Sequence, residues 1–427
     1  MARSTLWRSL AIGGSLALVL TACGGSDDTE AETTTAPEET AAAGGECSEG
    51  DGTLTIGTLL PETGSLAFLG PPEFAGVTLG VQEMNAAGGV LDADVVQIDS
   101  DSGDTSTNIA QQSVDTLLSQ DVDAIIGAAS SSVTLSVIDK ITGACVVQVS
   151  PANTSTALSD YDDGGFYFRT APSDVLQGRV LGDQVLADGY ANVAILALQD
   201  AYGETLAEEA TKAIEDGGGT VVFSEFYDPK ATDFTAVIDS AKSASPEAVI
   251  LIGFDETKTI VPQAVSRNFG PAQVPYYFVD GNLADYSADF DPGTLTGVKG
   301  TLPGADTDDE FKARLVEAYG EELTVFAYAA ESFDAAILIG LAAEQAGDDS
   351  GEAIAANLQS VSTEGTKCTT FAECKELIAN GEDIDYDGVS GPVEWAENGD
   401  PTAAFIGIYQ YDDTNNYTPV DFVEGNI

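Results

Sequence analysis

The chain has 427 residues, with 15 Lys and Arg against 71 Asp and Glu, no histidine, and a formal net charge of −56. Nucleic acids and anionic lipid surfaces repel such a chain, so we expect no nucleic-acid partner. The absence of histidine excludes Ser-His-Asp, Cys-His and His-metal chemistry, because the commonest general base and zinc ligand is missing.

Residues 1–22 predict a secretory signal peptide. Arg3 and Arg8 are followed by an apolar run at residues 10–20 and then by small residues up to Cys23. This run is shorter than the about 20 apolar residues that cross a bilayer, and no later segment is longer or as free of charge. Residues 20–23, Leu-Thr-Ala-Cys, resemble the bacterial lipobox, in which the cysteine accepts a diacylglycerol. We therefore expect lipidation of Cys23; the alternative is an ordinary signal whose Cys23 pairs with another cysteine.

Residues 23–50 are expected to form the lipidated N-terminus and a flexible acidic linker. Residues 24–45 consist of Gly, Ser, Thr, Ala, Asp, Glu and Pro, with no aromatic side chain to bury. The signal and the linker together predict an extracytoplasmic protein that a lipid anchors to the outer face of the cytoplasmic membrane.

Four cysteines remain once Cys23 is acylated, and an oxidising compartment favours disulfides. Four cysteines allow three pairings. Cys368 and Cys374 close a short loop, which favours Cys368–Cys374 and, by elimination, Cys47–Cys145. Reduced, buried thiols are the alternative.

From about Thr53 the chain alternates short apolar runs with longer amphipathic stretches. Strands are predicted at residues 54–60, 95–98, 124–127 and 146–150, and helices at 73–85, 107–119 and 133–141. The alternation resumes after residues 166–170. It predicts helices at 174–188, 206–216 and 234–244, and strands at 193–198, 220–225, 248–252 and 275–279. Repeated alternation of this kind is typical of α/β folds with parallel sheets, and about 380 folded residues favour two lobes.

Seven segments, in order, resemble the branched-chain amino acid binding family of ABC-importer receptors. They are residues 56–66 (IGTLLPETGSL), 85–90 (NAAGGV), 125–131 (IIGAASS), 150–154 (SPANT), 168–174 (FRTAPSD), 201–203 (AYG) and 387–392 (DGVSGP). The resemblance implies a type I periplasmic-binding-protein fold, with two Rossmann-like lobes joined by three crossover segments near residues 168–171, 298–302 and 388–393. It implies a first lobe of residues 51–170 with 301–388 and a second of 171–300 with 389–427.

Ligands of parallel α/β sheets bind beyond the carboxyl ends of strands, where helix N-termini offer free N–H groups. Ser130, Ser131 and Ser132 follow the strand at 124–127, so their hydroxyl and N–H groups suit a carboxylate; helix capping is a compatible role. The family aligns its ligand serine at Ser131. It aligns Ala152 as a backbone contact and Thr154 as a hydroxyl contact, although Thr154 could serve only as a turn or cap residue.

The resemblance also implies second-lobe contacts for a ligand ammonium group. Asp280 aligns with the acidic partner, where the branched-chain receptors carry Glu, and the shorter side chain leaves the identity of the ligand open. Tyr202 aligns with the tyrosine that covers the cleft. Phe68 and Leu69 align with an apolar pocket wall. Simple packing is the alternative for these apolar residues, and a solvated surface position is the alternative for Asp280.

Residues 383–394 match the calcium-loop pattern, with Asp383, Asp385, Asp387, Gly388 and a final Glu394. Pro392 and Val393 predict a strand after the loop in place of an exiting helix, and the aspartates adjoin a crossover of the family. We therefore expect no metal site, and we expect no cofactor.

The sequence thus predicts a non-enzymatic solute-binding lipoprotein of an ABC importer, monomeric, that binds a small zwitterion such as a branched-chain or other amino acid. A sensor that reports to a membrane receptor, and a receptor for urea, short amides or another small organic solute, are alternatives. A carboxylate-dependent hydrolase needs two facing carboxyl groups, and the sequence offers no distinctive pair. The acidic surface fits both a high-salt habitat and ordinary solubility.

Overall fold

The alternation of apolar runs and amphipathic stretches folds into two separate sheets. The computed structural model describes residue 47 and residues 49–427, which belong to one unit. The predicted signal peptide, Cys23 and most of the linker lie outside the described residues. Within the described part of the chain, no helix has the length and apolar character that a membrane span requires.

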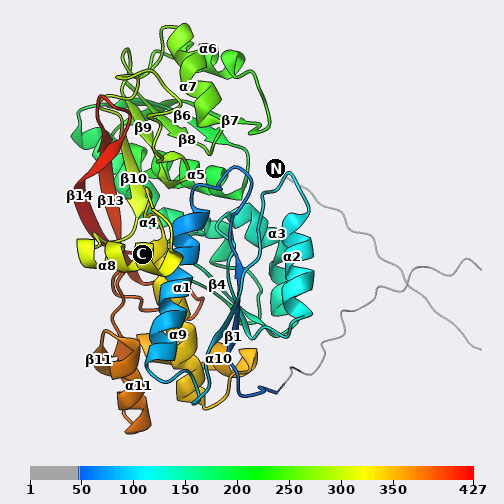
Figure 1. Ribbon diagram of the computed structural model, residues 1–427. Helices are drawn as coiled ribbons and strands as arrows, with labels where there is room; N and C mark the ends of the chain where they lie inside the picture. The colour runs from blue at the N-terminus through cyan, green and yellow to red at the C-terminus, as the bar shows by residue number, and fades with distance from the viewer. Residues whose placement is uncertain (1–46, 48) are drawn as a thin grey trace, which may run out of the picture. The chain divides into compact units, whose positions relative to one another are not determined.

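The smaller sheet has five parallel strands in the order β2-β1-β3-β4-β5. They are β1 (Thr55–Leu59), β2 (Val96–Ile98), β3 (Ala124–Gly127), β4 (Val147–Ser150) and β5 (Tyr167–Arg169). Figure 1 shows α1 (Gly70–Ala86) and α9 (Ala329–Ala346) on one face of this sheet, and α2 (Ile109–Leu118) and α3 (Ser131–Thr142) on the other. Both faces are therefore covered, which is why β3 reads as a continuous apolar run and β1 and β4 are buried almost throughout.

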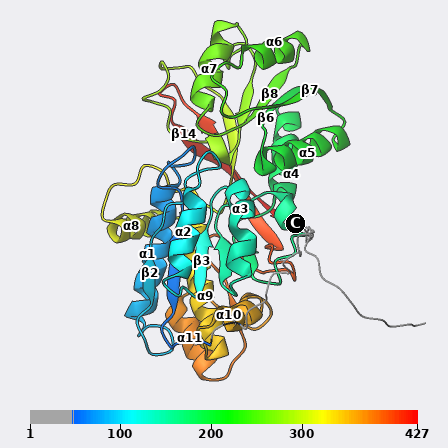
Figure 2. The same cartoon turned by 90° about the vertical axis from the view of Figure 1, so that its right-hand side faces the viewer.

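The larger sheet has seven strands in the order β14-β13-β10-β9-β8-β6-β7. They are β6 (Asn192–Leu198), β7 (Thr220–Tyr227), β8 (Ala248–Ile252), β9 (Tyr276–Phe278), β10 (Lys299–Pro303), β13 (Ala403–Tyr411) and β14 (Tyr417–Asn426). Strands β6 to β10 are parallel, whereas β13 and β14 form an antiparallel hairpin at the edge beside β10. Its helices, seen in the upper part of Figure 2, are α4 (Asp174–Ala187), α5 (Ala201–Asp216), α6 (Thr235–Ser243) and α7 (Thr257–Ser266).

The remaining elements belong to the smaller-sheet side, where α8 and α11 pack against α1. They are α8 (Asp309–Tyr319), α10 (Gly351–Leu358), α11 (Phe371–Ala379) and a two-stranded sheet of β11 (Thr366–Cys368) and β12 (Ile384–Tyr386). Short 3₁₀ helices are η1 (Thr156–Leu158), η2 (Asp280–Asn282) and η3 (Ser360–Ser362). We call the smaller sheet with these elements the first lobe, and the larger sheet with its helices the second lobe.

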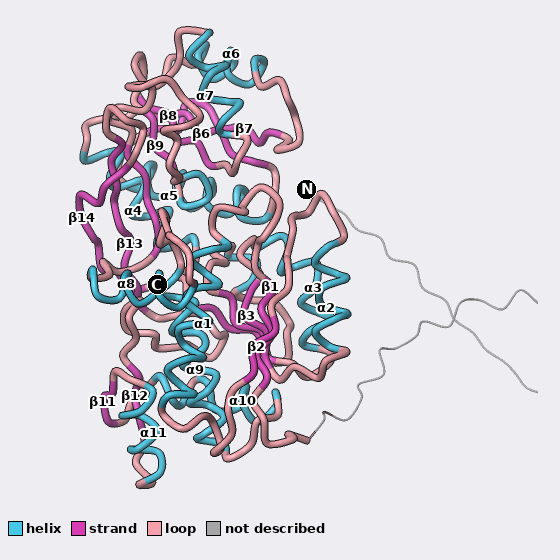
Figure 3. Tube along the Cα trace, viewed as in Figure 1, coloured by secondary structure: helices cyan, strands magenta, loops and turns pink. Residues whose placement is uncertain are grey.

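The described chain passes between the lobes three times: after β5, after β10 and between β12 and β13. The first sheet ends at Arg169, and β10 keeps the chain in the larger sheet as far as Pro303. Val393 and Trp395 still pack in the core of the first lobe, so the third passage follows them. Figure 3 shows the two groups of strands and the loops between them. The lobe boundaries predicted at residues 170, 300 and 388 stay predictions.

Two disulfides link the described cysteines. Cys47 is joined to Cys145, just before β4, and Cys368 at the end of β11 is joined to Cys374 in α11. The first bond attaches the start of the described chain to the first lobe.

Candidate functional site

The first-lobe wall of the site is the N-terminus of α3. Gly127 ends β3 with φ +128°, and a Cβ there would lie 2.1 Å from the Leu59 carbonyl oxygen, so only glycine fits the turn. Ser130 is the N-cap, and its hydroxyl accepts a hydrogen bond from the Val133 N–H at 3.4 Å. The helix begins at Ser131, two residues earlier than the sequence predicts. Its first N–H groups have no partner within the helix, and the helix dipole makes this end positive.

The loop after β4 completes this wall. The Ser150 hydroxyl donates to the Ala128 carbonyl oxygen at 2.7 Å, and Asn153 donates to the carbonyl oxygens of Ala128 and Ala129. These bonds hold the two loops side by side, with Ala152 and Ser131 facing the same cavity.

The second-lobe wall centres on Asp280, which follows β9. Its carboxylate accepts three hydrogen bonds from neutral donors: the hydroxyls of Tyr202 at 2.7 Å and Tyr328 at 2.8 Å, and the side-chain amide of Gln177 at 2.6 Å. The Asp280 side chain is only 5% exposed. Burial raises the pKa of this carboxyl, although the three hydrogen bonds partly offset the effect. Asp280 is thus a desolvated acid without a cationic partner among the described residues.

Aromatic rings flank this acid. Tyr202 lies in the first turn of α5, which begins at Ala201 because the Asp200 side chain caps it by accepting from the Gly203 N–H at 2.8 Å. The Tyr202 ring stacks on Phe254, with centroids 5.5 Å apart and planes 8° apart. Stacked ring faces beside a carboxylate suit a cation such as an ammonium group.

One cavity joins the two walls. The residues that line it are Leu66, Leu69, Ala129, Ser130, Ser131, Ala152, Tyr202, Phe254, Asp280, Gly281 and Tyr328. Its free volume is about 10 Å³, which is room for roughly one water molecule. An organic solute therefore enters only if the walls move apart.

Direct bonds between the lobes close the cavity. The Ser132 hydroxyl, at the start of α3, donates to the Asp200 carboxylate at 3.3 Å and accepts from the Ala201 N–H at 3.0 Å. The Ser155 hydroxyl donates to the Ala201 carbonyl oxygen at 3.0 Å. The N-terminal ends of α3 and α5 thus meet across the interlobe boundary, and these bonds must break for the lobes to separate.

The structure gathers six of the predicted site residues around this cavity: Leu69, Ser130, Ser131, Ala152, Tyr202 and Asp280. It places two elsewhere. Thr154 is buried behind the wall, where its carbonyl oxygen accepts from the Asp174 N–H at 2.7 Å, and Phe68 lines a neighbouring cavity with Lys258 and Val325.

Sequence reasoning missed five residues of the lining, namely Leu66, Ala129, Phe254, Gly281 and Tyr328. Phe254 and Gly281 follow β8 and β9, so the rule that ligands bind beyond strand ends could have found them. Tyr328 precedes α9 in the left-handed conformation, with φ 60°. No local signal in the sequence links it to Asp280.

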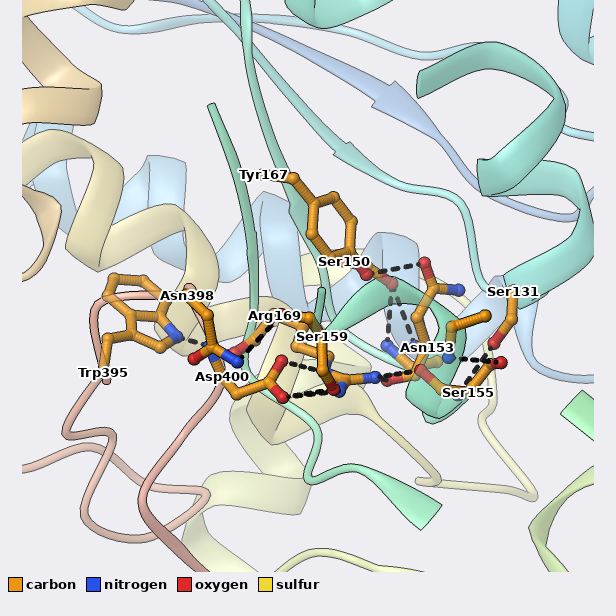
Figure 4. A network of polar contacts seen from close by, with 12 residues as sticks. Ser131, Ser150, Asn153, Ser155, Ser159, Tyr167, Arg169, Trp395, Asn398 and Asp400 are labelled. Carbon is orange, nitrogen blue, oxygen red and sulfur yellow. Dashed lines mark hydrogen bonds and ion pairs between the residues drawn. The ribbon is translucent and has the colours of Figure 1, made fainter. Parts of the chain in front are cut away.

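A buried arginine supports the site from behind (Figure 4). Arg169, at the end of β5, is 0% exposed, and its guanidinium pairs with Asp400 at 2.6 and 2.8 Å. It also donates to the Ser155 carbonyl oxygen at 2.9 Å, and the Ser155 N–H donates to the Ser131 hydroxyl at 3.3 Å. Hydrogen bonds thus connect the first and third passages between the lobes to Ser131, which lines the interlobe cavity.

The calcium-loop pattern folds differently from a calcium loop. Asp385 lies in β12, and the Lys367 ammonium is 2.8 Å from Asp385, 2.9 Å from Asp387 and 4.0 Å from Glu394. No metal-binding group of His, Cys, Asp and Glu is found among the residues that the structure describes. A lysine thus supplies the positive charge that these carboxylates face.

Comparison with known proteins decides the family. Residues 53–406 match the periplasmic binding protein family. The chain belongs to this family. Family membership implies an extracytoplasmic location, and the family consists of solute-binding proteins of the ABC-transporter type, so the chain is a binding protein and not an enzyme.

Two curated relatives of this periplasmic binding protein cover most of both chains. The chemotactic signal transduction substrate-binding protein BasB of Halobacterium salinarum is 28% identical, over 83% of this chain and 86% of its own. The Leu/Ile/Val-binding protein homolog 3 of Brucella melitensis is 26% identical, over 84% and 92%.

Solved structures confirm the predicted type I fold with two lobes. A leucine-binding protein from Thermotoga maritima has a TM-score of 0.71 at 20% identity, covering 87% of this chain and 98% of its own. A branched-chain amino acid transporter protein from Streptococcus pneumoniae, in complex with isoleucine, has a TM-score of 0.70 at 22% identity, covering 88% and 100%. A solute-binding protein from R. palustris, in complex with 4-hydroxybenzoate, has a TM-score of 0.73 at 16% identity, covering 88% and 98%.

Proposed function

We propose that the protein is a lipid-anchored receptor that binds a small zwitterionic amino acid between its lobes and presents it to an ABC permease. One observation carries the proposal: a single cavity joins the positive end of α3, with Ser130 and Ser131, to the buried carboxylate of Asp280. The first wall suits a carboxylate and the second an ammonium group.

The rest of the lining favours an aliphatic side chain. Leu66, Leu69, Ala129 and Ala152 present apolar groups, and Phe254 adds a ring face. Burial of such a side chain contributes about 1.5–3 kcal/mol. A branched-chain amino acid fits this combination, and the relatives named as Leu/Ile/Val-binding proteins support it.

Isothermal titration calorimetry tests the ligand class. We expect binding of leucine, isoleucine or valine, and much weaker binding of isovalerate, which keeps the carboxylate and the aliphatic chain but lacks the ammonium group. Other amino acids and urea complete the series. If no polar small molecule binds, the proposal is wrong; if isovalerate binds as tightly as valine, whose carbon skeleton it shares, the role of Asp280 is wrong.

Substitutions test the two walls separately. Asp280→Asn should weaken amino acid binding by about 100-fold, because truncating a buried charge partner costs about 2–5 kcal/mol. Ser131→Ala should weaken it by about tenfold, the effect of losing one hydrogen bond to a charged group. Asp291→Asn, at an exposed position of the same lobe, is the matched control and should bind as the unmodified protein does.

The anchor is tested by mass spectrometry of protein from the membrane fraction. A diacylglyceryl group on Cys23 is expected, and Cys23→Ala should release the protein from the membrane. Membrane association that survives this substitution would contradict the proposed lipidation.

A sensory receptor is the second candidate, because a relative of similar coverage is named as a chemotactic signal transduction protein. Deleting the gene separates the two functions. Loss of labelled amino acid uptake supports transport, whereas intact uptake with loss of taxis towards the same amino acid supports sensing.

A further inference from the structure

A second cavity lies beside the passage between the lobes that follows β10. Its volume is about 210 Å³. Its walls are the end of β10 with the loop that follows, the segment before α9, the first turn of α9, and the β13–β14 hairpin. Elements of both lobes therefore enclose it. Tyr328 lines this cavity as well as the interlobe cavity, so the two spaces share one residue.

A buried acid without a side-chain partner faces this second cavity. Glu331, in the first turn of α9, is 3% exposed and lines the cavity, and among the described residues no side chain donates a hydrogen bond to its carboxyl. Lys312 is the only positively charged residue of the lining, and no ion pair joins it to Glu331 in the described part of the chain. Its ammonium instead lies 6.0 Å from the centre of the Phe326 ring.

Gly304 keeps the space beside this acid open. It follows β10 with φ +121°, and a Cβ there would come within 2.6 Å of a Glu331 carboxyl oxygen. Because Gly304 has no side chain, the Glu331 carboxyl group can pack directly against the backbone at the cavity wall. Aromatic rings complete the surroundings: Phe326, Tyr409 and Tyr417 line the same cavity.

We propose that this cavity is a second ligand site, which binds a small organic ammonium ion through Glu331 and the surrounding rings. When ionised, a buried carboxylate that no side chain hydrogen-bonds is stabilised by a cation, and ring faces favour an ammonium group over a strongly hydrated metal ion. A volume of about 210 Å³ also exceeds what a bare ion fills. The site is distinct from Asp280, although Tyr328 lines both cavities.

The ionisation of Glu331 gives the site a dependence on pH. Burial raises the pKa of the Glu331 carboxyl to about 8; a hydrogen bond from the residue's own backbone N–H partly offsets this effect, and the charge of Asp334 adds to it. The other titratable or charged groups around it are Glu73 of α1, Asp306 and Lys312 of the cavity lining, Tyr328, Tyr409 of β13 and Tyr417 of β14. Because an ammonium ion binds the ionised form, affinity should rise with pH, roughly tenfold per unit below the pKa.

The probe is tetramethylammonium chloride, titrated into the protein at pH 8.5 and followed by calorimetry and thermal unfolding. Sodium chloride at the same concentration is the reference, because salt alone acts on a chain of net charge −56. We expect saturable binding that sodium does not reproduce and that weakens at pH 6.5. An equal response to sodium, or no saturable binding, overturns the proposal.

Substitutions test in which cavity tetramethylammonium binds. Glu331→Gln should reduce tetramethylammonium affinity at least tenfold, and Tyr417→Leu should reduce it through the loss of one ring. Glu310→Gln removes the same charge from an exposed position in α8 and should leave affinity unchanged. Asp280→Asn should also leave it unchanged. Loss of binding in Asp280→Asn with retention in Glu331→Gln would place the ion in the interlobe cavity and refute the second site.

Discussion

Arg169 and Asp280 are both buried charged residues, yet their surroundings differ. Arg169 pairs with Asp400, which neutralises its charge, and also donates hydrogen bonds to two backbone carbonyl oxygens and to the Ser159 hydroxyl. Asp280 meets only neutral donors. A paired buried charge fixes the positions of the segments that it joins. An unpaired buried charge destabilises the folded protein, and a cationic ligand that pairs with it removes this cost. The contrast separates a structural residue from a candidate ligand contact.

The largest expected effect is the loss of the paired charge. Arg169→Met leaves Asp400 buried without a cation, so the free energy of unfolding should fall by about 3–5 kcal/mol. Guanidinium chloride unfolding measures it. Arg267→Met is the matched control, because Arg267 pairs with Asp239 on the surface, where both side chains are roughly half exposed, and a pair of that kind contributes about 0–1 kcal/mol. Equal losses in the two variants would contradict the structural role of Arg169.

The unpaired charge should behave in the opposite way. Asp280→Asn removes a desolvated carboxylate; its amide oxygen can keep the bond from Tyr202, and its NH2 group can donate to the Tyr328 hydroxyl, which now bonds the other carboxylate oxygen. The ligand-free protein should therefore gain stability on the order of 1 kcal/mol. Thermal unfolding without ligand measures this gain, and the variant should then lose the further stabilisation that amino acid gives the unmodified protein. A clear destabilisation of ligand-free Asp280→Asn would mean that Asp280, like Arg169, has a structural role.

The protonation state of Asp280 provides a further test of the difference between Asp280 and Arg169. Burial raises the pKa of its carboxyl above the usual 3.8, and a bound ammonium group lowers it again. At pH values where Asp280 of the ligand-free protein is partly protonated, binding should therefore release up to about one proton. The affinity should fall as the pH drops through the pKa of Asp280 in the ligand-free protein. Titration in two buffers of different ionisation enthalpy counts the protons. Release that persists in Asp280→Asn would assign the proton to another group.

The sequence predicts the fold where the chain's local signals are complete. Strands β3 and β8 have the predicted bounds because each is a short apolar run between polar turns. Helices α1 and α5 begin earlier than predicted, because the apolar periodicity starts only after their first turns; Asp200 caps α5, whereas α1 has no side-chain cap. Pro71 and Pro72 occupy the first turn of α1, where a missing N–H costs nothing. Helix α7 is not predicted, and Pro262 inside it argues against a helix on local rules.

Local sequence signals likewise predict some residues of the candidate site and miss others. Ser130, Ser131 and Asp280 directly follow strands, so strand ends and family alignment together find them. Tyr328 and Arg169 depend on partners distant in sequence: the Tyr328 hydroxyl reaches Asp280 across 48 positions, and Arg169 pairs with Asp400 across 231. No periodicity or motif in the sequence predicts contacts between residues so far apart in the chain, and only the folded structure shows them.

The smallest effect should come from Lys367, an exposed counterpart of Arg169. Its ammonium contacts Asp385 and Asp387, but the side chain is 51% exposed. Solvent and salt screen such a cluster, so Lys367→Met should change the free energy of unfolding by less than about 1 kcal/mol, and by still less in molar salt. Since Lys367 already supplies the positive charge, calcium should not raise the unfolding temperature of the unmodified protein. A rise with calcium that Asp383→Ala abolishes would show that the acidic segment binds the ion despite the lysine.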